Sequence, residues 1–169
     1  MRKTLAVTLA VILVLGGVLL GGQATPASAG GHTILAFNTM VGVPPTFTGT
    51  QNPIRGIDGG GLPWMLTSAS GSLKDSGKLK VEVEGLVLAA GPNEGKNPIA
   101  DFRATVSCLT TGGVIDNETT GLFPATTGSA LSGGGNADIE AILSLPHPFI
   151  APIIFVTSPG GAWFAATGR

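Results

Sequence analysis

The feature that most constrains the fold is a period of two in the apolar residues that follow position 29, broken at short intervals by glycine and proline. In the clearest case, Leu79, Val81 and Val83 alternate with charged residues. The segment 30–169 has no sustained apolar period of 3.6 residues, so we expect no crossover helix. The sequence therefore predicts an all-β fold, either an antiparallel β-sandwich or a Greek-key barrel, of about eight strands.

Turn residues set the limits of the expected strands. Gly112-Gly113 predicts a tight hairpin turn. After Gly85 consecutive residues are apolar, so both faces of the expected strand are apolar there. Either the strand is covered on both faces at this point, or Gly85 marks a bulge that shifts its facing. The apolar, β-branched segment 150–157 predicts a central strand. The expected strands are 32–40, 66–73 and 79–88 (as a hairpin), 99–110, 114–123, 137–145, 150–157 and 162–167.

The first 29 residues have the order of a secretory signal of bacterial type. Met1-Arg2-Lys3 is basic, the run from Thr4 to Leu20 is apolar, and small residues lead to Ala27-Ser28-Ala29. The apolar run is near the lower limit for spanning a bilayer and no basic cluster follows it, so cleavage after Ala29 is favoured over a retained anchor. The sequence predicts a signal peptide at 1–29, a single secreted, extracellular domain at 30–169, and no membrane association after cleavage.

The charge balance argues against one class of partner. The whole chain has a net charge of −1, and the loss of Arg2 and Lys3 with the signal changes it to −3. Lys74, Lys78 and Lys80 are offset by neighbouring acidic residues, so no basic patch emerges. Nucleic-acid binding requires such a patch, and we therefore expect no nucleic-acid partner.

Cys108 is the only cysteine of the chain, so a monomer has no internal disulfide. It shares one face of the expected strand 99–110 with Phe102, Ala104 and Val106. This pattern favours a buried core thiol. An intermolecular disulfide and a reactive thiol are the alternatives.

Catalytic and metal-binding motifs are incomplete. The chain has no Gly-x-Ser-x-Gly elbow, and its closest approach to a phosphate loop, at 71–78, is one residue too long. His32 and His147 lie at opposite ends of the segment 30–169, so no metal site is expected. If the protein is an enzyme, the candidate groups are His147 with Asp101, Asp138 or Glu140. The two carboxylates of 137–145 are more simply the solvent face of a strand.

Trp64 and Trp163 are the candidate ligand-binding residues, because the chain has no tyrosine and both follow glycine-rich turns. An exposed indole can stack on a sugar ring or an apolar partner and donate its N–H group. The alternative is that both rings pack in the core or at its rim.

Five segments together resemble a group of short exported proteins of soil and environmental bacteria that have no assigned activity. The resemblance implies export and a β-rich fold, and it transfers no catalytic residue. It also implies a second cysteine where this chain has Phe149, which would make Cys108 the unpaired half of a family disulfide. The segments are 60–64, 84–88, 101–109, 123–127 and 150–165.

From these observations we expect a secreted, non-enzymatic β-sandwich with a structural, surface-associated or ligand-binding role and no cofactor. The first alternative is a carbohydrate-binding or adhesion module that uses Trp64 or Trp163. Its partner would be a cell-wall polysaccharide or a surface protein. The second alternative is a hydrolase of unfamiliar type.

Overall fold

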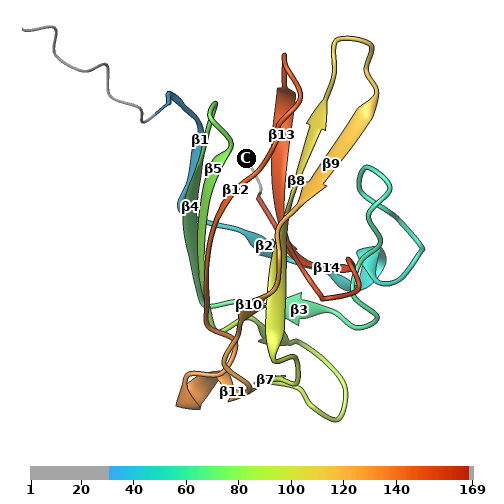
Figure 1. Cartoon of the computed structure of the whole chain (residues 1–169). Helices are drawn as coiled ribbons and strands as arrows, with labels where there is room; N and C mark the ends of the chain where they lie inside the picture. Colours follow the sequence, from blue (N-terminus) through green and yellow to red (C-terminus); the bar gives the residue numbers. More distant parts are fainter. Residues whose placement is uncertain (1–30, 168–169) are drawn as a thin grey trace, which may run out of the picture.

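A computed structural model describes residues 31–167, in which two main antiparallel sheets lie face to face (Figure 1). The predicted signal peptide, its cleavage site and its apolar run lie outside the described residues. The first sheet has the strand order β1-β4-β5-β12. Its strands are β1 (Thr33–Phe37), β4 (Ser68–Lys74), β5 (Lys78–Glu84) and β12 (Ala137–Ile142).

The second sheet has the order β10-β8-β13-β14-β2, and β9 also pairs with β8. In this sheet β2, from the N-terminal part of the described chain, pairs with β14 at its C-terminal end. Its strands are β2 (Val41–Gly42), β8 (Asp101–Leu109), β9 (Ile115–Thr119), β10 (Phe123–Pro124), β13 (Ile150–Thr157) and β14 (Trp163–Ala166).

Two short pairs and two 3-10 turns complete the described part. β3 (Trp64–Met65) pairs with β6 (Val87–Leu88), and β7 (Lys96–Asn97) pairs with β11 (Gly128–Ser129). The 3-10 turns are Pro45–Phe47 and Ala130–Ser132. Within 31–167, no helix has the length and apolarity needed to cross a bilayer.

The antiparallel all-β prediction is confirmed, whereas the barrel alternative is wrong because no sheet closes on itself. Two facing sheets support the predicted sandwich. Every strand of four or more residues corresponds to one of the eight expected strands. The six two-residue strands were not predicted, because two residues are too few for a period to be recognised.

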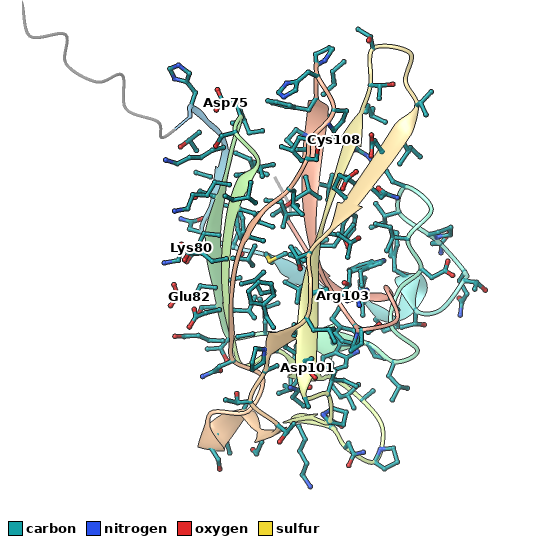
Figure 2. The ribbon with its side chains drawn as sticks, in the orientation of Figure 1. Asp75, Lys80, Glu82, Asp101, Arg103 and Cys108 are labelled. Carbon is teal, nitrogen blue, oxygen red and sulfur yellow. The ribbon has the colours of Figure 1, made fainter. Side chains whose placement is uncertain are left out.

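The core lies between the sheets and follows from the alternation of β5. Leu79, Val81 and Val83 are buried while the charged residues between them are exposed, as predicted. Figure 2 shows Lys80 and Glu82 directed away from the second sheet. Across the core, alternate residues of β8, including Phe102 and Val106, are fully buried in the same cluster.

Gly85 marks the place where the chain leaves the first sheet. It has a positive φ of 62°, a backbone conformation in which a side chain is strained. β5 ends at Glu84, and Leu86, Val87 and Leu88 are all buried beyond it. Neither predicted alternative describes this place, because the strand ends at Glu84 and Val87–Leu88 form a separate strand, β6, which pairs with β3.

β13 is a central strand, as predicted, but only over its second half. It pairs with β8 on one side and with β14 on the other. The pairing with β8 contains a bulge, because Ile150 lies opposite Leu109 and the next pair is Ile153 with Ser107. β14 ends at Ala166, opposite Phe155, so residues 150–153 have no strand on that side. Ile150 is accordingly 44% exposed.

The facing of β5 gives a direct test of the fold. Val83→Asp places a charge at a position that is 1% exposed, and we expect it to cost several kcal/mol or prevent folding. Glu82→Ser should be silent or slightly stabilising, because Glu82 lies opposite Asp138 on the solvent face. Urea unfolding of both variants measures the difference. Equal midpoints would contradict the assigned facing.

Candidate functional site

A cleft of about 450 Å³ lies where β1 of the first sheet faces the uncovered edge of β13. One charged side chain, Arg55, lines it, and the other lining residues are mainly apolar. They are Ile34, Leu35, Ala151, Pro152, Ile153 and Thr167. The cleft is present because β14 ends before it covers this part of β13.

Arg55 reaches the cleft from the long loop between β2 and β3, and three hydrogen bonds fix its position. Its Nη1 donates to the carbonyl oxygen of Ser107 at 2.8 Å, and its Nη2 donates to the carbonyl oxygen of Ala151 at 2.7 Å. The side-chain amide of Asn117 donates to the carbonyl oxygen of Arg55 at 3.2 Å. The bulge in β13 interrupts the ladder beside Ser107, which lets the guanidinium group bind there.

Arg55 and Ala151 are also the two residues other than glycine that have positive φ within 31–167. Their φ angles are 51° and 47°. This left-handed region is unfavourable for residues with a Cβ and is found most often where surrounding structure imposes it, including functional sites. A hydrogen bond joins these two residues at the wall of the cleft. The two unfavourable conformations therefore belong to one feature.

The guanidinium charge of Arg55 has no carboxylate partner in the part of the chain that the structure describes. Within residues 31–167 no carboxylate lies within ion-pair distance of Arg55, and its two acceptors are neutral carbonyl groups. A guanidinium group has five N–H donors, so three remain after these two bonds. The Nε atom of Arg55 is not among the buried atoms that lack a hydrogen-bond partner.

Cys108 is a buried core thiol, as expected, with 0% exposure. Burial raises the pKa of the thiol above its ordinary value, the Arg55 charge acts in the opposite direction, and the Asp116 carboxylate adds to the rise. A thiol that is buried and protonated is a poor nucleophile. The interpretation of Cys108 as the unpaired half of a family disulfide stays a prediction; this chain has Phe149 at the position where the resemblance implies the second cysteine.

Both tryptophans are buried, Trp64 at 5% and Trp163 at 2% exposure. Trp64 stacks on Phe164 with ring centroids 3.9 Å apart. Trp163 lies between Phe47 and Phe155, with centroids 6.3 Å and 6.1 Å away. Neither ring has a free face for stacking on a sugar, so the geometry favours the core-packing alternative.

The candidate catalytic groups do not converge. His147 lies three residues before Ile150, which pairs with Leu109 at one end of β8, whereas Asp101 begins β8 at the other end (Figure 2). A nine-residue strand is about 27 Å long. Asp138 and Glu140 lie on the exposed face of β12, opposite Glu82 and Lys80. No group of three or more potential metal ligands occurs within residues 31–167.

One row of residues in the second sheet carries buried polar atoms that lack hydrogen-bond partners. Buried atoms without a hydrogen-bond partner in the described part include Arg103 Nε, Thr157 Oγ1 and Trp163 Nε1. Thr157 pairs with Arg103 on one side and with Trp163 on the other, so the three residues form one row across β8, β13 and β14. None of the three residues lines the cleft beside Arg55.

Thr157 allows a test of this packing. Thr157→Val removes a buried hydroxyl that has no partner, so stability should be unchanged or higher by up to about 1 kcal/mol. Thr105→Val is the matched control, because Thr105 Oγ1 lies 3.0 Å from Thr119 Oγ1. That variant should lose about 1 kcal/mol in urea unfolding. A similar loss for Thr157→Val would mean that the Thr157 hydroxyl does have a hydrogen-bond partner.

Sequence analysis did not identify Arg55. The residue lies in the segment Asn52-Pro53-Ile54-Arg55-Gly56, which resembles any polar turn. Its acceptors are 52 and 96 residues away along the chain. No local pattern carries that information.

Comparison of the chain with protein-family models, with curated proteins and with solved structures gives no match. The functional argument therefore depends on the geometry of the cleft.

Proposed function

We propose that the protein is an exported, non-enzymatic β-sandwich domain that binds a ligand in the cleft beside Arg55. The observation that carries the proposal is a fixed arginine whose charge has no carboxylate partner in the described part of the chain. Charged side chains that are partly buried are usually paired, so an unpaired one in a hollow is the expected mark of a binding site.

The size and walls of the cleft support this proposal. Ligand sites are usually concave, largely apolar and equipped with few polar groups, with volumes of about 300–1,000 Å³. The cleft, at about 450 Å³, lies within that range and has apolar walls around one cation. The cleft lies between a strand of the first sheet and a strand of the second, so its shape depends on how the two sheets pack together.

The alternatives have less support. A carbohydrate-binding role through Trp64 or Trp163 needs an exposed ring, and both rings are buried. A hydrolase built on His147 needs a carboxylate beside it, and Asp101 lies at the far end of β8. The adhesion alternative has a cell-wall polysaccharide or a surface protein as its partner, and the experiments below test the polysaccharide.

The binding proposal predicts that blocking the cleft abolishes ligand binding. Ile34→Trp introduces a large ring at the cleft wall, on an edge strand, and Ile142→Trp makes the same change at a position that is 79% exposed on β12. A ligand at 100 times its Kd stabilises a protein by about 2.7 kcal/mol, which raises the Tm by on the order of 10 °C.

The measurement is a thermal-shift screen of residues 30–169 with anionic, cationic and neutral small molecules, together with pull-down on cellulose, chitin and peptidoglycan. We expect at least one class to stabilise the wild type and Ile142→Trp but not Ile34→Trp. If every class fails, or if binding persists in Ile34→Trp, the cleft is not the binding site. Retention on a polymer that is unaffected by Ile34→Trp would support the adhesion alternative.

Export is a separate part of the proposal and rests on residues 1–29. Cleavage after Ala29 requires small residues at 27 and 29, so Ala27→Gln should leave the precursor uncleaved. Ser28→Gln is the matched control, because the position between the two small residues tolerates larger side chains. Mass spectrometry of the protein from the culture medium should give a chain that begins at Gly30. A chain that is retained in the cells would contradict the prediction.

A further inference from the structure

We infer that the ligand of the cleft is a carboxylate that bears an aliphatic group, with Arg55 binding the carboxylate and the apolar walls enclosing the chain. This inference rests on the proposed binding role of the cleft. It adds the chemical class of the ligand and the residue that selects it.

The first argument is that Arg55 is already ordered. Its guanidinium group is held by carbonyl oxygens from β8 and β13, and its main chain is held by Asn117. A free surface arginine loses rotamer entropy when it binds an anion, whereas this side chain has lost that freedom on folding. Three N–H groups of the same fixed plane form no hydrogen bond with residues 31–167, and the planar guanidinium group matches the geometry of a carboxylate.

The second argument concerns the charge of the ligand. Arg55 is the only charged residue among those that line the cleft. Thr167 is the only other polar side chain there, and its hydroxyl oxygen accepts the N–H of Ile154 at 3.1 Å. A phosphate carries close to two negative charges and is normally bound by several cations or main-chain N–H groups. One cation therefore suits a monoanion.

The third argument concerns the rest of the ligand. Ile34, Leu35 and Ile153 make the walls apolar, so the part of the ligand beyond its head group should be apolar too. A water molecule in the liquid takes up about 30 Å³, so a cleft of about 450 Å³ has room for about 15 atoms of that size. An acid of eight to ten carbons fits this volume.

The fourth argument separates two sources of such a carboxylate, a free aliphatic acid and the C-terminus of a peptide. A peptide in an open strand edge normally adds to the sheet through main-chain hydrogen bonds. Pro152 has no N–H group, and the bulge with a positive φ at Ala151 distorts the same edge. The edge therefore discourages strand addition, and the inference commits to the free acid as the better ligand.

The experiment is isothermal titration of residues 30–169 with octanoate, octanamide, octyl phosphate, acetyl-Ala-Leu and the C-terminal amide of that peptide. We expect octanoate to bind most tightly and octanamide to bind about 10- to 100-fold more weakly, because it lacks the charge. Binding of octanoate should decline below about pH 4.5, where the acid becomes protonated and neutral.

Two arginine variants complete the design. Arg55→Gln should weaken octanoate binding about 10- to 100-fold without affecting octanamide, and Arg55→Lys should restore part of the loss. Arg103→Gln is the matched control, because Arg103 also has an unpartnered Nε but does not line the cleft. Circular dichroism checks the fold, and if Arg55→Gln does not fold, the comparison of acid with amide in the wild type decides the question.

The outcomes separate this inference from the proposed function. Equal binding of octanoate and octanamide, both abolished by Ile34→Trp, would overturn the carboxylate while the binding cleft stands. Tighter binding of octyl phosphate or of acetyl-Ala-Leu than of octanoate would also overturn the inference. If none of the five compounds binds at millimolar concentration, the carboxylate inference is overturned, whether or not another ligand binds the cleft.

Discussion

The structure depends on the burial of β8 on both of its faces. Phe102, Ala104, Val106 and Cys108 are fully buried and face the first sheet, while Thr105 and Ser107 are buried on the opposite face. A strand that is buried on both faces requires a second cover in addition to the facing sheet. Part of that cover is the loop between β2 and β3, whose Phe47 contacts Trp163 and whose Arg55 binds the Ser107 carbonyl.

The same loop links core packing to the cleft. The bulge of β13 leaves the Ser107 carbonyl available, and the guanidinium group of Arg55 occupies that place. A neutral side chain could satisfy the carbonyl at lower desolvation cost, because a charge that is partly removed from water requires compensation. An arginine at this place is explained if its remaining N–H groups bind an anion, because the anion compensates for the desolvation of the charge. This requirement connects the fold to the proposed ligand.

Sequence reasoning was most accurate where one face of a strand meets solvent. In β5 the alternation of charged and apolar residues gave both the strand and its facing, because water and the core select opposite residue types at a period of two. For the segment 150–157 it gave the central strand but not the exposure of its first half. An apolar run has no period, and whether a neighbouring strand covers it depends on where β14 ends.

The candidate site was predicted poorly for a related reason. Trp64 and Trp163 were candidates because they are large rings beside glycine turns. Whether each ring is buried or exposed depends on the strands and loops that pack against it. Arg55 was missed because its partners come from β8, β9 and β13. His147 and Asp101 were candidates as residue types, and the length of β8 separates them.

The sequence by itself determined the all-β class, the eight longer strands and the inward face of β5, because these follow from interactions of each residue with water or with near neighbours. Only the tertiary structure decided which hydrophobic runs are covered, that both indoles are buried and that one loop arginine lies in a cleft with no carboxylate partner among residues 31–167. These features arise where segments distant in sequence meet, as when Arg55 binds a carbonyl oxygen 96 residues away. Long-range contacts of this kind leave no local period or composition by which they could be recognised.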